Sequence, residues 1–247
     1  MGEESGLAGL VRRDTLADQV AQLLIRSIVE RKLRPGDELP SESQLSAQYG
    51  VSRPVAREAL RHLAALNMIQ LANGKLPAVK PLGGELLGIY FEWALQLEDS
   101  TFVELHELRR GVEGACALYA AERRTEPDVA RLRALLEQMR REDDAEAFTD
   151  LDLQLHLAIA EAAHNRLLQH TVESIRLSMR KVIRTGLELM DDASGKESPI
   201  VRLRRAHAAI VEDIVVQDPE AARRRMDEHL RGAVANFVAA GSRPDPE

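Results

Sequence analysis

A short break between two helical segments constrains this chain more than any other feature of its sequence. The run Ser41–Gln44 is a capping box that predicts the start of a short helix, and Gly50 is suited to end that helix as a C-cap. Ser52 is a good N-cap and a proline follows inside the first turn, so a second helix is expected to begin at Arg53. The predicted order is helix, turn, helix.

The second of these helices carries a stripe of arginines. Arg53, Arg57 and Arg61 lie at i, i+4 and i+8, which places them in one narrow sector of the helix. Arginines near the start of such a helix can bond to guanine O6 and N7 in the DNA major groove. A solvated charged face on an ordinary amphipathic helix would show the same stripe, so the surrounding sequence has to decide. The neighbouring face, expected to pack inward, holds Val55, Ala59, Leu63 and Leu66.

The flanking sequence completes a recognisable order of elements. A capping box at Thr15 opens an upstream helix, which the turn residues 34–37 end. Downstream, residues 68–71 and 76–80 are predicted to form two short strands around Asn73-Gly74, a pair typical of tight turns. Helix, helix, turn, helix and hairpin is the order of a winged helix-turn-helix.

The charge is unevenly distributed along the chain. Residues 12–80 hold eleven basic and seven acidic residues, a net charge of +4, whereas residues 81–247 hold 22 basic and 31 acidic residues, a net charge of −9. A basic front on an acidic body indicates that the front alone contacts nucleic acid.

Composition also excludes several classes of protein. A single cysteine, Cys116, excludes an internal disulfide and suits a reducing compartment. No apolar run approaches the roughly 18 residues of a membrane-spanning helix, and residues 1–10 lack a signal-peptide layout. We therefore expect a cytoplasmic protein without membrane contact, with a flexible tail at residues 1–11.

Beyond a linker at residues 81–85 the apolar spacing is helical throughout. The longest loop is expected at residues 191–196. The sequence therefore predicts a mainly α chain, with a winged helix-turn-helix over residues 12–80 and an all-α antiparallel bundle over residues 86–247. The seven helices predicted for the bundle span residues 86–97, 101–124, 127–141, 145–163, 166–190, 199–216 and 219–239.

Four polar residues lie at or beside the inward faces of the predicted bundle helices. Asp152 and His156 stand at i and i+4 on one helix, and His207 and His229 lie on the apolar stripes of two others. A buried Asp or His needs a partner, and one shared divalent metal would satisfy all four. A lone inward histidine is more often a hydrogen-bonded core residue, so spacing leaves both interpretations open. Four histidines belong to no comparable set: His62, His106, His164 and His170.

Residues 15–80 resemble the DNA-binding domain of the GntR family of bacterial transcription regulators, through the runs Arg34–Glu42 and Gly50–Leu60. The resemblance implies a homodimeric repressor on a palindromic operator in double-stranded DNA. Two departures are that Ser43 stands where many members carry a DNA-contacting arginine, and that the wing lacks the commoner Gly-x-Gly pattern. The DNA-binding residues that the resemblance implies are Arg34, Ser41, Ser52, Arg53, Pro54, Arg57, Asn73, Gly74 and Lys75.

The later part of the chain resembles the FCD ligand domain of the FadR-type GntR subgroup. The resemblance rests on the runs Leu151–Ile159, His164-Asn165, Ala206–Ile210 and His229-Leu230. It implies a divalent metal with coordination sites left open to water or to an effector carboxylate. One carboxylate oxygen and three imidazoles suit Zn²⁺, Ni²⁺ or Mn²⁺, and the sequence does not choose among them. The implied metal ligands are Asp152, His156, His207 and His229.

Arg109 matches an arginine that often lies over the ligand cavity of that domain. A guanidinium near a metal can grip a small organic acid bidentately, so the resemblance implies that Arg109 binds the effector. An ion pair with Glu113, one helical turn away, is the other interpretation. Arg180 and Arg184 could also reach the cavity, although a surface role is expected for each.

Two other functions account for part of the sequence. An open site on Asp and His can activate water, as in a metal-dependent enzyme with an accessory DNA-binding domain. Against an enzyme, no Asp or Glu base has a spacing that ties it to the metal, and an enzyme would leave residues 15–80 unexplained. The third possibility is a regulator in which the metal only holds helices together.

Overall fold

The computed structural model describes residues 14–97, 101–176, 178 and 198–239, with side chains described except at 101–102 and 233–239. Contacts divide the chain into two compact units, Met1–Gly83 and Gly84–Glu247. In the part of the chain that is described, no helix is long and apolar enough to cross a membrane. The predicted tail at 1–11, the predicted loop at 191–196, Arg180 and Arg184 lie outside the described residues.

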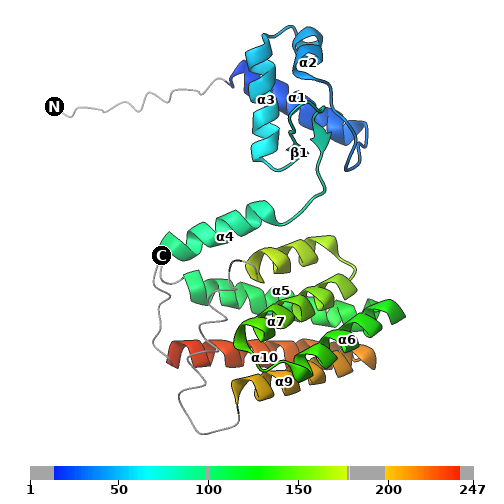
Figure 1. Ribbon diagram of the computed structural model, residues 1–247, viewed down its shortest axis with the longest axis vertical. Coiled ribbons are helices and arrows are strands. Elements are labelled where there is room, and N and C mark those ends of the chain that lie inside the picture. Colours follow the sequence, from blue (N-terminus) through cyan, green and yellow to red (C-terminus); the bar gives the residue numbers. More distant parts are fainter. Residues whose placement is uncertain (1–13, 98–100, 177, 179–197, 240–247) are drawn as a thin grey trace, which may run out of the picture. The chain divides into compact units, whose positions relative to one another are not determined.

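The first unit contains the predicted helix-turn-helix (Figure 1). Its helices are α1 (Leu16–Glu30), α2 (Glu42–Tyr49) and α3 (Arg53–Ala65). Thr15 and Ser41 cap α1 and α2 with complete capping boxes. Gly50 ends α2 with φ of 66°, a left-handed conformation that glycine adopts without steric cost. The break between α2 and α3 therefore arises from local backbone preferences.

The hairpin is present but shorter than predicted. Strand β1 (Ile69–Gln70) pairs antiparallel with β2 (Ala78–Val79), with Ile69 opposite Val79. Pro77 has no N–H to donate, so the ladder cannot extend toward the turn beyond Ala78. Its carbonyl instead accepts from the backbone N–H of Leu39 at 2.7 Å, and Glu38 forms a bridge with Ala78. The segment before α2 thus lines the second edge of β2.

The inward face of α3 differs in part from the prediction. Ala59 and Leu63 are fully buried as expected, but Leu66 is 50% exposed because it caps the end of the helix and lies beyond its last packed turn. Ala56 and Leu60 complete the buried stripe instead. This stripe packs on α1 and α2 in one core cluster, together with Leu24 and Leu45 among others. The arginine side of α3 is left exposed.

The second unit is helical, which confirms the predicted fold class (Figure 1). Pro127, Pro199 and Pro219 stand in the first turns of their helices, where a missing N–H costs nothing. Residues 166–176 are also helical, within the range predicted for 166–190. The labelled helices are α4 (Glu85–Leu97), α5 (Thr101–Arg123), α6 (Glu126–Arg141), α7 (Ala145–Ala162), α9 (Pro199–Val215) and α10 (Pro219–Ala239).

Helix α5 runs through the middle of this unit. It packs against α7, α9 and α10, and Figure 1 shows α7 and α10 alongside it. Three of its residues, Ala117, Ala120 and Ala121, are completely buried, and side chains this small let neighbouring helices approach closely. Larger side chains such as Phe148, Ile159 and Ile210 fill the same core. Polar groups that project inward from α5, α7, α9 and α10 therefore meet one another.

Candidate metal centre and nucleic-acid interface

The start of α3 presents a group of exposed polar atoms. Ser52 occupies the N-cap position, but its hydroxyl makes no capping hydrogen bond. Arg53 and Pro54 fill the first two helical positions, and both are exposed. The first backbone N–H groups of a helix have no intrahelical partner and favour anions. The residues that the sequence predicted for DNA contact on α3 therefore lie together on an accessible helix start.

Arg57 is held by an acidic residue of the preceding helix. Its Nε lies 3.0 Å from Glu42 Oε1 and its Nη2 lies 2.9 Å from Glu42 Oε2. The hydrogen bond from Arg57 lowers the pKa of Glu42, and the same bond raises the pKa of the Arg57 guanidinium. Both side chains remain substantially exposed. The pair fixes the direction of Arg57 on the surface without burying it.

The other predicted DNA contacts lie in turns. Gly74 has φ of 72° in the tight turn closed by the hydrogen bond from Lys75 N to Ala72 O, at 3.1 Å. Asn73 and Lys75 are exposed beside it. The turn at Arg34 is joined to the hairpin, since Gly36 N donates to Val79 O at 2.8 Å.

At α2 the hydroxyl of Ser41 is engaged in capping, 3.3 Å from Gln44 N, and lies 3.1 Å from Ser43 Oγ. The residue is half-buried and therefore the least accessible of the nine predicted DNA contacts.

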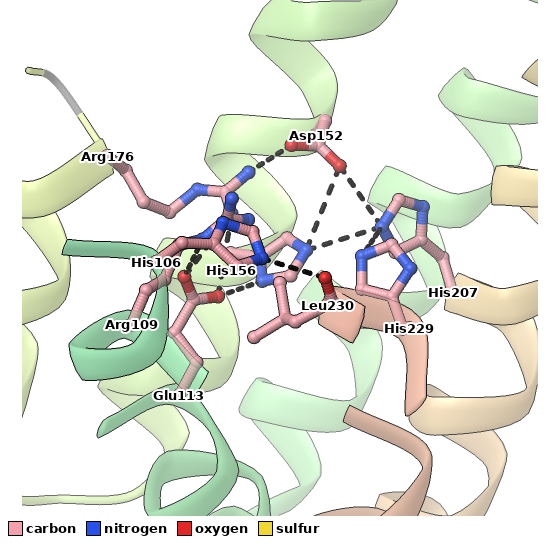
Figure 2. A network of polar contacts seen from close by, with 9 residues as sticks. All are labelled: His106, Arg109, Glu113, Asp152, His156, Arg176, His207, His229 and Leu230. Carbon is pink, nitrogen blue, oxygen red and sulfur yellow. Dashed lines mark hydrogen bonds and ion pairs between the residues drawn. The ribbon is translucent and has the colours of Figure 1, made fainter. Parts of the chain in front are cut away.

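In the second unit, four predicted residues converge on one point (Figure 2). Helix α7 supplies Asp152 and His156, α9 supplies His207, and α10 supplies His229. One ligand atom from each residue lies within 4.8 Å of the other three, and only His229 is not fully buried. The i, i+4 spacing on α7 places two donors on one face, and the antiparallel packing of α9 and α10 brings the other two to meet them.

The contacts among these atoms are too many for hydrogen bonds alone. Nε2 of His207 lies 3.1 Å from Asp152 Oδ1, 3.3 Å from His156 Nε2 and 3.2 Å from His229 Nε2. A neutral ring nitrogen carries either one proton or one lone pair, so it cannot satisfy three such neighbours. Ligands bound tetrahedrally about 2.0–2.1 Å from a zinc ion lie about 3.3 Å apart. The donor types and their separations therefore fit a divalent metal.

A second set of buried charges supports the four donors (Figure 2). Glu113 Oε2 accepts a hydrogen bond from Nδ1 of His156, which leaves Nε2 of that ring to face the other donors. Arg176 donates to Oδ2 of Asp152, so Oδ1 is the oxygen that points toward the histidines. Arg176 also lies 3.4 Å from both oxygens of Glu113. Glu113 thus orients the ring of His156, and Arg176 orients the carboxylate of Asp152, each through an atom that does not face the other donors.

Arg109 occupies the position of the i, i+4 ion pair. Its Nε lies 2.5 Å from Glu113 Oε1, and both side chains are nearly inaccessible to solvent. Among the described contacts, only Nε of this guanidinium is engaged in a hydrogen bond. The structure therefore shows the ion pair with Glu113. Because Glu113 also contacts His156, Arg109 is linked to the four donors through one intervening residue.

The surroundings set the protonation of the cluster. Burial, reinforced by the charge of Arg176, lowers the pKa of His156 to about 4. Burial and the neighbouring imidazoles lower the pKa of His229 well below its ordinary value. Burial alone would raise the pKa of Asp152, but Arg176 and the two nearest histidines lower it well below the usual range. A neutral imidazole and an ionised carboxylate are the forms that bind metals.

Sequence reasoning missed Arg176, the role of Glu113 toward His156, and the role of Glu42 toward Arg57. One signal for Arg176 was present, because it follows Val172 at i+4 and Ile175 at i+1, both buried, on a helical stripe. An arginine on an apolar stripe needs an acidic partner. Nothing in a single sequence indicates which acids on α5 and α7 provide it.

Comparison with known proteins identifies both units. Residues 16–79 match the family model described as bacterial regulatory proteins, gntR family, and residues 104–232 match the FCD domain. The galactonate operon transcriptional repressor of Escherichia coli K12 is 31% identical over 211 residues, covering 83% of this chain and 89% of that protein.

A second relative and a solved structure agree. The HTH-type transcriptional regulator LutR of Bacillus subtilis 168 is 29% identical over 200 residues, covering 81% of this chain and 90% of that protein. Among solved structures, Streptococcus agalactiae GntR has a TM-score of 0.60 at 23% identity and covers 87% of this chain and 98% of that one. At this identity the likeness concerns the fold.

The buried charge network generates a prediction about stability. Arg176→Met removes the guanidinium that faces Asp152 and Glu113, so two buried carboxylates lose a partner. We expect the metal-free helical unit to lose about 3–5 kcal/mol in urea unfolding, as for other broken buried ion pairs. Arg231→Met is the matched control, because Arg231 pairs with Asp227 at 2.8 Å on an exposed surface. Equal losses in the two variants would contradict the importance of the network.

Proposed function

Because this chain belongs to the gntR family of bacterial regulatory proteins, and is thus a DNA-binding transcription regulator, we propose that its helical unit senses a small organic acid beside a divalent metal ion. The observation that carries the proposal is the convergence of Asp152, His156, His207 and His229 within 4.8 Å. The relatives that the chain matches are transcription regulators, which argues against the metal-dependent enzyme.

The DNA-binding role of individual residues rests on the exposed start of α3. Arg53 and Arg57 lie one turn apart, and a guanidinium can bond bidentately to the major-groove edge of guanine. Ser52 and the free N–H groups of the first turn suit a phosphate. Lys75 and Asn73, at the tip of the hairpin, are accessible for a second contact with the backbone or groove. We assign the same role, contact with an operator half-site, to Arg34 and Ser41.

The metal would be held by Asp152 and the three histidines, with Zn²⁺, Ni²⁺ or Mn²⁺ as the ions that suit such a set. When bound, the ion supplies a positive charge and open coordination positions for an anionic ligand. The chain's own residues orient the donors, since Glu113 fixes the ring of His156 and Arg176 fixes the carboxylate of Asp152.

Charge balance favours an organic anion as the effector. The two guanidiniums of Arg109 and Arg176 offset the two carboxylates of Glu113 and Asp152, while the pKa values of His156 and His229 keep those imidazoles neutral. A divalent ion would therefore leave a net positive charge in a buried site. A buried charge is costly unless it is paired, and a small carboxylate supplies the pairing. Among the described contacts, only Nε of the Arg109 guanidinium is engaged in a hydrogen bond, so its other nitrogens could bind such an anion.

The effector can act on DNA only through a difference in binding free energy. An acid that binds one arrangement of the helical unit better than another shifts the equilibrium between them. A homodimer on a palindromic operator would place two α3 helices at half-sites about 34–36 Å apart or a multiple of that spacing. In this proposal, the effector changes how well the two DNA-binding units of the dimer match this spacing.

A first prediction concerns the recognition helix. Arg53→Ala should weaken binding to a palindromic duplex selected with the wild-type protein, by about 1–3 kcal/mol per half-site if a bidentate base contact is lost. Arg26→Ala removes the same charge from an exposed position on α1 and serves as the control. Gel shifts at fixed salt measure both. Wild-type affinity in Arg53→Ala would remove α3 from the DNA interface.

A second prediction concerns the metal. The purified protein should contain about one divalent ion per chain, and its removal by a chelator should lower the melting temperature. His207→Ala and His229→Ala should each reduce the metal content, because one ligand is lost and its neighbours cannot fill the gap. His164→Ala, an exposed histidine that contacts Asp128 instead, should keep the full content. Elemental analysis decides, and full loading of both cluster variants would show that these histidines are core residues only.

A third prediction concerns the effector. In a thermal-shift screen of small organic acids, galactonate among them, at least one should raise the melting temperature of the metal-loaded protein. At 100 times its dissociation constant a ligand stabilises by about 2.7 kcal/mol. Arg109→Lys keeps the charge beside Glu113 but not the fork of donors, so it should reduce the shift and retain the metal. An equal shift in Arg109→Lys would exclude Arg109 from the effector site, whereas bound metal without any responsive acid would favour a purely structural metal.

A further inference from the structure

Three consecutive residues of the helical segment 166–176 face two different parts of the second unit. Arg176 contacts Asp152 and Glu113 in the charge network. Ile175 is fully buried in a small cluster with Phe91 of α4 and Leu105 of α5. The hydroxyl of Ser174 lies 2.6 Å from the carbonyl oxygen of Gly84 and 2.6 Å from that of His170, and either can accept its hydrogen. One turn of helix therefore connects the proposed metal centre with α4.

The contact with α4 repeats one turn further along. Ser178 Oγ lies 3.3 Å from the carbonyl oxygen of Gly88 and 2.9 Å from that of Ser174, four residues earlier. Ser174 Oγ likewise lies 2.6 Å from the carbonyl oxygen of Gly84 and 2.6 Å from that of His170. The serines are four residues apart and so are the glycines, so each pair spans one helical turn. We call these four residues the serine–glycine contact. Hydroxyl groups that reach backbone carbonyls of a neighbouring helix require that the two backbones lie close together.

The two glycines are not equivalent in this contact. A Cβ added at Gly84 would lie 2.0 Å from Ser174 Oγ and 2.4 Å from the backbone oxygen of His170, which cannot move without moving the helix. A Cβ added at Gly88 would meet nothing within 4 Å. The absence of a side chain at position 84 is therefore a condition of the packing, whereas position 88 would accept alanine.

On its other side, the segment contacts the proposed metal centre through the guanidinium of Arg176, which has one nitrogen without a hydrogen bond in the described structure. Arg176 is completely buried, and its Nε has no hydrogen-bond partner among the described residues. Its contacts to Glu113 are long, at 3.4 Å, so this guanidinium is held mainly by Asp152. Any change in the position or charge of Asp152 therefore alters the restraint on Arg176 and on the helix that carries it.

We propose that the helical residues 166–176, together with Ser178, relay the state of the metal centre to α4 through the serine–glycine contact. Helix α4 begins at Glu85, two residues after Gly83, the last residue of the DNA-binding unit, so a change in its docking reaches the connection to that unit. This inference rests on the proposed function, because the signal originates at the four metal-binding residues. It names the residues through which binding at one site is coupled to another, which requires an element whose position both sites influence.

The experiment uses the full-length protein and the metal alone as the probe. Hydrogen exchange of the α4 amides is measured by mass spectrometry in chelator-treated protein and after addition of Zn²⁺, Ni²⁺ or Mn²⁺. Trp93 is the only tryptophan of the chain and lies on α4 with 63% of its surface exposed, so its fluorescence gives an independent readout. We expect metal loading of the wild-type protein to slow exchange in α4 by about tenfold, within the usual range of coupling between sites.

Two sets of variants separate the relay from simple stabilisation. The double variant Ser174→Ala, Ser178→Ala removes both hydroxyls, and the Gly84 carbonyl keeps its helical bond from Gly88 N at 2.8 Å. This variant should bind metal as the wild type does, while the response of α4 falls below about twofold. Gly84→Ala should likewise lose the response, because its Cβ displaces the segment, and the matched control Gly88→Ala should retain it.

Each outcome supports or overturns the relay. Loss of the α4 and Trp93 responses with full metal content in the serine variant and in Gly84→Ala supports it. An unchanged response in these variants, with metal bound, overturns the relay and leaves the proposed metal site intact. Failure of the wild-type protein to bind any of the three ions overturns the proposed function and the relay with it. An equal loss of response in Gly88→Ala would show a general effect of α4 substitution and would also overturn the relay.

Discussion

The second unit depends on the charge network in which Arg176 faces Asp152 and Glu113. These groups come from three separate helical segments, and none of them is tolerable in the interior alone, because an unpaired buried charge costs several kcal/mol. Their mutual pairing fixes which oxygen of Asp152 and which nitrogen of His156 face the other histidines. The orientation of the donors is thus a consequence of the contacts that Glu113 and Arg176 make with them. A metal would bind to a site that is already arranged.

The chain uses arginine–carboxylate pairs in two energetically different settings. Arg57 and Glu42 form a bidentate pair on the surface, where solvent competes and the net contribution to stability is small. The pair between Arg109 and Glu113 has the same chemistry but almost no exposure, so loss of either partner would leave a desolvated charge. The first setting suits a side chain that exchanges partners with DNA. The second suits a residue that holds the interior in one arrangement.

Local signals in the sequence predicted most of the fold. Capping residues such as Thr15 and Ser41, the left-handed Gly50 and the helix-opening prolines act within a few residues, so their effects can be read without knowing the tertiary structure. The inward positions of the four predicted metal ligands followed from helical spacing for the same reason. Whether they bind a metal, and whether the nine DNA contacts are made, stays a prediction.

What could not be predicted depends on contacts between distant segments. The exposure of Leu66 depends on where α3 ends. The shortness of the strands depends on Pro77 and on the bridge between Glu38 and Ala78 of β2. The partners of Arg176 lie 24 and 63 residues away along the chain, so no local pattern names them. The same holds for Glu42 and Arg57, which are 15 residues apart on different helices.

The composition of α4 has a consequence for its stability as a helix outside the bundle. The helix has 13 residues, includes Gly88 and begins next to Gly84, and isolated helices of this length are marginal in water even with better helix formers. Its apolar surface is largely exposed, and Phe91 is the one residue of the helix that is buried in the described structure. Its helical form therefore depends on packing in the bundle, where Phe91 meets Leu105 of α5 and Ile175. In a fragment that ends after α4, the DNA-binding unit would be followed by a frayed segment. The order of this connection is therefore a property of the bundle and not of the connecting sequence.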